Sequence, residues 1–164
     1  MKPVLNIADV TLRTSEHGDK FSAKLGRIGV RIGAQKLGCQ LHIVPPGKTA
    51  FPRHDHHANE EMFLILEGEG HYRFGPETYP IRKGDVLSAP AGTAEATAHQ
   101  ILNSGASDLH YLAFSTRNDP DVVEYADSNK FMVSSMVPPD GGLRAASIMH
   151  IARPDSSLDY WDGE

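Results

Sequence analysis

The chain has 164 residues, and its 16 Lys and Arg against 21 Asp and Glu give a net charge of -5 at pH 7. Because no basic cluster is present, we expect neither nucleic acids nor anionic membranes as partners. The single cysteine, Cys39, cannot form an intrachain disulfide, and the first residues lack the basic and apolar regions of a signal peptide. These features predict one cytoplasmic domain over residues 1–164, large enough to fold without disulfides or structural zinc.

Short strand-like segments separated by turn residues fill the first two thirds of the chain. After a loose N-terminal arm, residues 21–32 are expected to supply edge strands. Glycine, proline and asparagine turns then separate further predicted strands at 41–44, 61–66, 71–74, 85–89 and 109–115. No central window has a helical period, and no proline falls inside these strands. The pattern predicts an all-β sandwich or barrel.

The last part of the chain, from about residue 119, has weaker signals. Turn residues at 127–129 and 138–142 precede a segment, 147–152, that alternates well enough for a strand. The chain closes on the aromatic pair Tyr160 and Trp161. Aromatic side chains need a surface to pack on, so this pair is expected either to cap the barrel of its own subunit or to cross to a partner subunit.

Two stretches, 47–68 and 84–103, contain the residues that point to chemistry. His54 and His56 are two positions apart, so on an extended strand both side chains leave the same face. A short turn would bring Glu61 back beside them, and a third imidazole must come from a distant strand. Imidazole and carboxylate groups at these spacings can converge on one divalent cation. The candidate ligands are His54, His56, Glu61 and His99.

The two stretches resemble the paired motifs of the cupin superfamily. The first family motif has a glycine, then a His-x-His pair, a glutamate and a second glycine, and residues 47–68 contain the same order of residues. In the second motif, Gly84, Pro90 and Gly92 stand at the positions where the family has a glycine, a proline and a glycine. The resemblance implies a double-stranded β-helix, or jelly-roll, barrel with a metal in its mouth. The motif-bearing core is expected at about 36–117, between N-terminal edge strands and a C-terminal extension, 119–164.

The second motif departs from the family pattern. Six residues separate Gly92 from His99, where the family usually has two, and strict counting places Glu95 at the histidine position. We predict that His99 is the ligand, because Asn103 follows it at the family spacing and residues 99–103 read as a strand. Residues 93–98 would then form an inserted loop at the cavity mouth.

The resemblance implies one divalent transition metal per chain, with iron, manganese, nickel and zinc not distinguished. Four protein ligands on an octahedral ion leave two positions for water, dioxygen or substrate. Such a site suits a metal-dependent enzyme acting on a small polar organic molecule, either as a dioxygenase or as an isomerase or lyase. It also suits a non-catalytic protein that binds or senses a sugar, a carboxylate or an auxin-like ligand. No catalytic acid or base is identifiable from the sequence.

Other polar residues have two interpretations each. Gln40 and His42 share one strand face and line the cavity if that face points inward; otherwise the alternating residues 41 and 43 do. Arg53, Tyr72 and Arg73 are candidates for contacting substrate, although each residue type is commonly found at the surface. His57 is expected to point away from the ligands.

We also expect a homodimer. Jelly-roll barrels expose sheet edges, the segment 62–66 is apolar throughout, and two-fold dimers are the commonest oligomers. The terminal arms would be natural covers for these surfaces.

Overall fold

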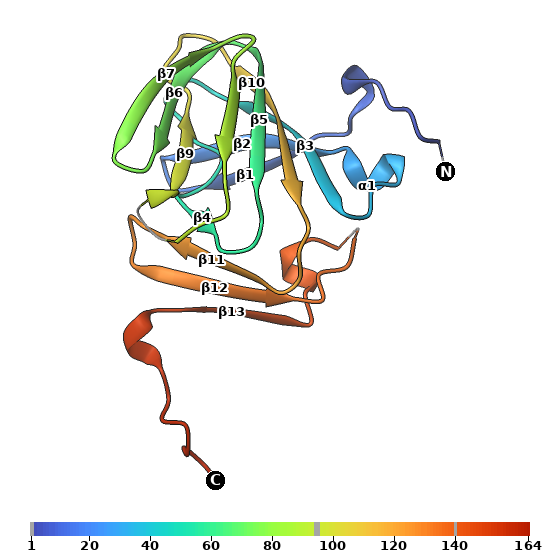
Figure 1. Ribbon diagram of the computed structural model, residues 1–164. Coiled ribbons are helices and arrows are strands. Elements are labelled where there is room, and N and C mark those ends of the chain that lie inside the picture. The colour runs from blue at the N-terminus through green and yellow to red at the C-terminus, as the bar shows by residue number, and fades with distance from the viewer. Residues whose placement is uncertain (1, 94–95, 140) are drawn as a thin grey trace.

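The computed structural model describes residues 2–93, 96–139 and 141–164. Antiparallel strands form a barrel from two facing sheets (Figure 1). This confirms the predicted all-β jelly roll, and among the described residues no helix is long and apolar enough to cross a membrane. The larger sheet has the order β1 (Arg13–His17), β2 (Phe21–Arg27), β3 (Leu37–Val44), β10 (Leu109–Thr116), β5 (Glu61–Glu67), β8 (Val86–Ala89), and the smaller sheet β7 (Glu77–Arg82), β6 (Glu69–Phe74), β9 (His99–Leu102).

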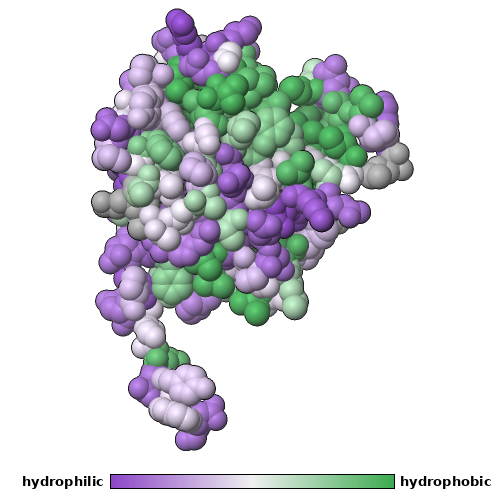
Figure 2. Space-filling view, viewed as in Figure 1, coloured by the Kyte–Doolittle hydropathy of each residue, from purple (hydrophilic) through white to green (hydrophobic). Residues whose placement is uncertain are grey.

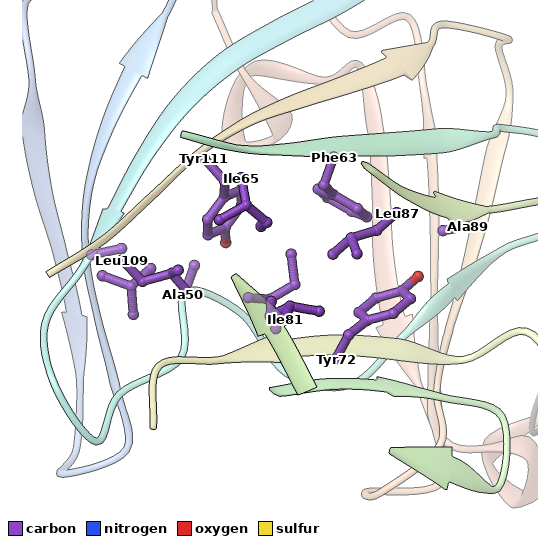
Figure 3. Packing of buried hydrophobic residues seen from close by; sticks show 12 residues of the cluster. Ala50, Phe63, Ile65, Tyr72, Ile81, Leu87, Ala89, Leu109 and Tyr111 are labelled. Carbon is purple, nitrogen blue, oxygen red and sulfur yellow. The ribbon is translucent and has the colours of Figure 1, made fainter. Parts of the chain in front are cut away.

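The main hydrophobic core lies between these two sheets (Figure 3). Alternate side chains of each strand point inward, so Phe63 and Ile65 of β5 are buried whereas Met62 is half exposed. Phe63 packs against Tyr72 and Tyr111, with ring centroids 6.3 and 6.0 Å apart. Because Tyr72 lies inside, its hydroxyl needs a partner and donates to the carbonyl of Ser88.

A second apolar layer covers the outer face of the larger sheet. Val10 of the N-terminal arm packs there with Ile28 and Leu41, close to the short 3-10 helix η1 (Ile7–Asp9). The predicted strand over 21–32 is correct only as far as β2, because α1 (Gly29–Ile32) follows it. Gly29 packs closely against β3: a Cβ there would be 3.0 Å from the amide nitrogen of Cys39, so a larger residue would fit at the start of α1 only if its neighbours shifted.

The C-terminal extension forms a third sheet. Its order is β13 (Ile148–Ala152), β12 (Lys130–Ser135), β11 (Asp121–Tyr125), β4 (Asp55–His56). The strand predicted at 147–152 is thus confirmed as β13. Because β11 pairs with β4, this sheet lies across the end of the barrel that carries the candidate ligands (Figure 1). Short 3-10 helices, η3 (Leu143–Ala145) and η4 (Pro154–Ser156), flank β13.

Two further points differ from the sequence prediction. Strand β7 was not predicted and contains Pro80, which is tolerated because β7 is at the edge of its sheet. Tyr160 and Trp161 do not cap the barrel of their own subunit, since their exposed fractions are 85% and 71%. Figure 2 shows the C-terminal segment projecting from the body of the molecule as a separate lobe.

Asn103, just after β9, provides a stability test. Its buried amide donates to the carbonyls of Val44 and Ser107 at 2.7 and 2.8 Å, and its oxygen accepts from the amide of Gly105. We expect Asn103→Ala to lower the free energy of unfolding by about 2–4 kcal/mol, because buried carbonyls lose their donors. The exposed amide of Asn118 donates to Ala58, so Asn118→Ala should cost about 1 kcal/mol or less. Equal losses for both variants in urea denaturation would contradict this assignment.

Candidate metal centre

The two motifs meet where strand ends adjoin. His54 immediately precedes β4, Glu61 begins β5 and His99 begins β9. The backbones of His54 and His99 form a bridge, because each amide donates to the carbonyl of the other at 3.1 and 2.7 Å. The amide of Gly92 also donates to the carbonyl of His56 at 3.0 Å. Residues 45 and 36 positions apart in the sequence are therefore fixed side by side by main-chain hydrogen bonds.

Three imidazoles face one carboxylate oxygen. The Nε2 atoms of His54, His56 and His99 lie 3.6, 3.7 and 2.9 Å from Oε2 of Glu61. His54, Glu61 and His99 each offer a potential ligand atom, and these atoms lie within 4.8 Å of one another. His56 is outside that tight group, although its Nε2 points to the same oxygen. The structure thus brings all four predicted residues to one place, three of them closely.

The other nitrogen of each imidazole faces an oxygen acceptor. Nδ1 of His54 is 2.8 Å from the carbonyl of Pro52, and Nδ1 of His99 is 3.3 Å from that of Thr97. Nδ1 of His56 is 2.8 Å from a carboxylate oxygen of Asp121. When Nδ1 carries the proton and donates it to such an acceptor, Nε2 presents a lone pair. The surroundings therefore favour the tautomers in which three Nε2 lone pairs converge on the centre.

Glu61 is held in its charged form. Burial alone would raise the pKa of this carboxyl, but the imidazoles of His54 and His99, and the charge of His56, hold the pKa well below its usual range. For His56, burial lowers the pKa, while the hydrogen bond to Asp121 and the charge of Glu61 outweigh it and raise the pKa. An anionic oxygen surrounded by imidazole nitrogens has the donor chemistry of a first-row divalent metal site.

These residues line a cavity of about 380 Å³ between the inner face of the larger sheet and the C-terminal sheet. Gln40 and His42 both line it, whereas Leu41 and Ile43 pack in the outer apolar layer, which settles the orientation of β3. Burial lowers the pKa of His42 to about 4, so this imidazole is neutral at pH 7. Its Nε2 is 2.9 Å from the amide oxygen of Gln40.

Other residues singled out in the sequence lie elsewhere. Arg53, Tyr72 and Arg73 do not line the cavity. The two arginines pair with Asp127, and the hydroxyl of Tyr72 donates to the carbonyl of Ser88. His57 pairs with Glu124 at 2.9 Å and points away from the ligands. Glu95 lies outside the described residues, and its comparison with His99 stays a prediction.

Asp121 is a site residue that the sequence analysis missed. It is 65 positions from the histidine that it contacts, in a segment with no motif. Only the pairing of β11 with β4 brings the two together. A lone aspartate at the start of a short strand gives no sequence signal for such a role.

Comparisons with known proteins agree with the fold. Residues 40–115 match a family model described as a cupin domain. An oxalate-binding protein from Thermotoga maritima is 36% identical over 70 residues, which cover 43% of this chain and 54% of that protein. The chain spans between about half and two thirds of the length of the curated relatives it matches.

Two solved structures match over nearly the whole chain. A protein from Acidithiobacillus ferrooxidans, described provisionally as a sugar phosphate isomerase, has a TM-score of 0.79 and 25% identity, with 96% of both chains covered. A sugar phosphate isomerase of a cupin superfamily from Silicibacter pomeroyi has a TM-score of 0.78 and 22% identity, with 98% of both chains covered. At 22% identity, the similarity to the Silicibacter pomeroyi structure shows the fold alone.

The ligand set predicts which substitutions remove a bound metal. We expect His99→Ala and Glu61→Ala to lose the divalent ion, because each removes a donor from the tight group. His57→Ala is the matched control, since this imidazole points away from the centre. Elemental analysis of the purified variants measures the outcome. Full occupancy in the His99 and Glu61 variants, or loss in the His57 variant, would contradict the ligand set.

Replacing Asp121 is expected to weaken metal binding indirectly, through His56. Without its carboxylate, Nδ1 of His56 loses the acceptor that fixes the tautomer, so Asp121→Ala should weaken metal affinity about 10- to 100-fold. The control is Glu124→Ala, which removes the carboxylate paired with His57 on the same strand. Competition with a chelator gives both affinities. An unchanged affinity for the Asp121 variant would mean that His56 needs no such support.

Proposed function

We propose that this chain, a member of the cupin superfamily with its cupin domain at residues 40–115, is a metal-dependent isomerase of a small sugar-like carbonyl compound. Sugar phosphates are the first class to test. The observation that carries the proposal is the convergence of three Nε2 atoms on Oε2 of Glu61 in the wall of a cavity of about 380 Å³. This volume lies within the range of small-molecule sites.

The four residues fit one divalent transition metal per chain. We propose His54, His56, Glu61 and His99 as its ligands, supported by their donor types and by the acceptors that orient the three imidazoles. Iron, manganese, nickel and zinc all accept such donors. When bound, the metal would polarise a substrate carbonyl as a Lewis acid.

The remaining cavity residues would bind and orient the substrate. With Oε1 of Gln40 engaged by His42, the amide NH2 of Gln40 is the group left to donate to a substrate oxygen. Burial raises the pKa of Tyr111 and of Tyr125, so both phenols stay protonated and would serve as donors to a substrate oxygen; without substrate, the hydroxyl of Tyr125 donates to the sulfur of Met132. Apolar side chains, including Phe51, Phe63 and Met132, would exclude water around the reacting carbons.

We prefer isomerisation because the solved structure that suggests it matches nearly the whole chain. The Acidithiobacillus ferrooxidans protein matches over 96% of this chain, including the C-terminal sheet that walls the cavity. An aldose-to-ketose conversion moves hydrogen between neighbouring carbons and needs no external oxidant. The dioxygenase alternative uses the same metal ligands and is distinguished by a requirement for oxygen.

A non-catalytic binding protein is the second candidate. The relative from Thermotoga maritima is described as an oxalate-binding protein, and it matches the motif region at 36% identity. The same metal would then anchor a carboxylate ligand without turnover. Binding without conversion separates this candidate from the isomerase.

The expected homodimer and the cytoplasmic location remain proposals. Exposed apolar side chains on β13 and on the projecting C-terminal segment support the dimer, because nothing in the described part of the chain covers them: Ile148, Ile151, Leu158 and Trp161. Light scattering at micromolar concentration measures the oligomeric state.

Proton NMR in D2O tests the catalytic proposal. The metal-loaded protein should interconvert the aldose and ketose forms of a sugar phosphate. Deuterium beside the carbonyl of the product would show that the hydrogen moves as a proton exchanged with solvent, and its absence would show a direct hydride shift between the two carbons. We expect Glu61→Ala to fall to the background rate, and His57→Ala to keep the wild-type rate. Absence of turnover across tetrose, pentose and hexose phosphates, together with tight oxalate binding, would favour the binding protein instead.

A further inference from the structure

Strand β13 is an open edge of the C-terminal sheet. It pairs with β12 on one side, and no strand in the described part of the chain pairs with its other side. Figure 1 shows β13 as the strand of this sheet that lies farthest from the barrel. The main-chain groups along its outer edge are therefore accessible to a strand of another molecule.

The sequence of β13 lacks the usual protection of an edge strand. Edge strands commonly carry charged residues or proline, which discourage pairing with other molecules. The edge strands β1 and β7 follow this rule, with the sequences RTSEH and ETYPIR. Strand β13 reads IMHIA and contains no proline, lysine, arginine or acidic residue. Its composition therefore suits pairing with a second strand.

Apolar side chains are exposed on both faces of β13. Ile148 lies on one face, Met149 and Ile151 lie on the other, and all three are about half exposed. Met132 of β12 stands directly opposite Ile151, yet it is only 4% exposed and lines the cavity. The cover that the barrel gives to this face of the sheet therefore ends between β12 and β13.

The segment after β13 adds further apolar surface. Leu158, Tyr160 and Trp161 are largely exposed, and the segment projects from the body of its own chain (Figure 2). Together with the three apolar side chains of β13 they present roughly 750 Å² of accessible surface, taking about 200 Å² for a fully exposed side chain. A stable dimer of standard size buries about 800 Å² on each partner. The patch therefore has the size that a second copy of this chain would cover.

Charged residues at the two ends of β13 favour an antiparallel partner. Arg144 precedes the strand, whereas Asp155 and Asp159 follow it. When two copies of one strand pair antiparallel about a two-fold axis, the beginning of each lies beside the end of the other. Arg144 of each copy would then approach Asp155 of the other copy. Parallel pairing would instead bring like charges together.

We propose that this protein forms a two-fold dimer in which the β13 strands of two copies pair antiparallel and join the two C-terminal sheets into one. This inference rests on the homodimer proposed above and does not depend on the reaction. In that arrangement each C-terminal segment runs past the start of the other copy's β13.

The loop between β12 and β13 lies at that point. Its side chains Met136 and Leu143 are exposed, and Leu143 also lines the cavity. Tyr160 and Trp161 of one copy would pack on this loop of the other, because aromatic rings so exposed need an apolar surface. Each subunit would thus cover the outer side of the other subunit's cavity wall.

Light scattering after size-exclusion chromatography tests the pairing. We expect the wild-type protein at micromolar concentration to have twice the 17.9 kDa mass of the chain. Ile151→Lys should have the mass of one chain, because two-fold pairing would bring the introduced charges of both copies into one interface. Met62→Lys is the matched control and should remain a dimer, since Met62 is also half exposed but lies on β5.

Two measurements on the wild-type protein need no variant. Trp161 is the single tryptophan of the chain, so its fluorescence reports the C-terminal segment. We expect blue-shifted emission that acrylamide quenches poorly in the dimer, and a red shift on dilution to the monomer. The amides of β13 should exchange with D2O more slowly in the dimer than in the diluted monomer, because pairing gives their outward N–H groups acceptors.

The outcomes separate this interface from the other proposals. A wild-type monomer at micromolar concentration would overturn both the homodimer and the interface. A dimer that survives Ile151→Lys would overturn the β13 pairing and leave the homodimer standing, whether or not Met62→Lys dissociates it. Full quenching of Trp161 in a dimer that Ile151→Lys dissociates would overturn the packing of the C-terminal segment alone. None of these measurements uses a substrate, so the isomerase proposal keeps its own test.

Discussion

Three imidazole nitrogens face one carboxylate oxygen, and a cation, either a proton or a metal ion, would stabilise the lone pairs gathered there. The Nε2 atoms of His54, His56 and His99 lie within 3.7 Å of Oε2 of Glu61. Lone pairs so arranged repel one another unless a proton or a metal ion lies between them. Each imidazole is held in place through its other nitrogen, so the cluster cannot easily relax by turning a ring away.

The C-terminal sheet is part of the site. Asp121 of β11 orients His56, and residues of β11, β12 and the loop after them wall the cavity. Asp127, in the turn between β11 and β12, pairs with Arg53 and Arg73. Arg53 adjoins His54, while Arg73 also bonds to Gln100, which adjoins His99. One carboxylate of the third sheet thus contacts arginines that adjoin His54 directly and His99 through Gln100.

Sequence reasoning succeeded where a local pattern dictates the structure. Local patterns were enough to predict the barrel and to identify the candidate ligands. These patterns are the strands bounded by glycines, the His-x-His pair and the strand that begins at His99. Sequence reasoning failed where contacts are distant or signals weak. Asp121 contacts a histidine 65 positions away, and β11 and β12 are short strands with polar residues interspersed. The inward orientation of Gln40 and His42 stayed open because the opposite face of β3, with Leu41 and Ile43, is the more apolar one. Only the outer layer that packs on that face shows that it points away from the cavity.

Anomalous X-ray diffraction from crystals grown with a divalent transition metal, recorded at that metal's absorption edge, tests the central claim most directly. We predict one strong peak per chain, within bonding distance of Nε2 of His54, His56 and His99 and of a carboxylate oxygen of Glu61. A peak bonded through an Nδ1 atom, a peak that excludes Glu61, or no peak at saturating metal would contradict it.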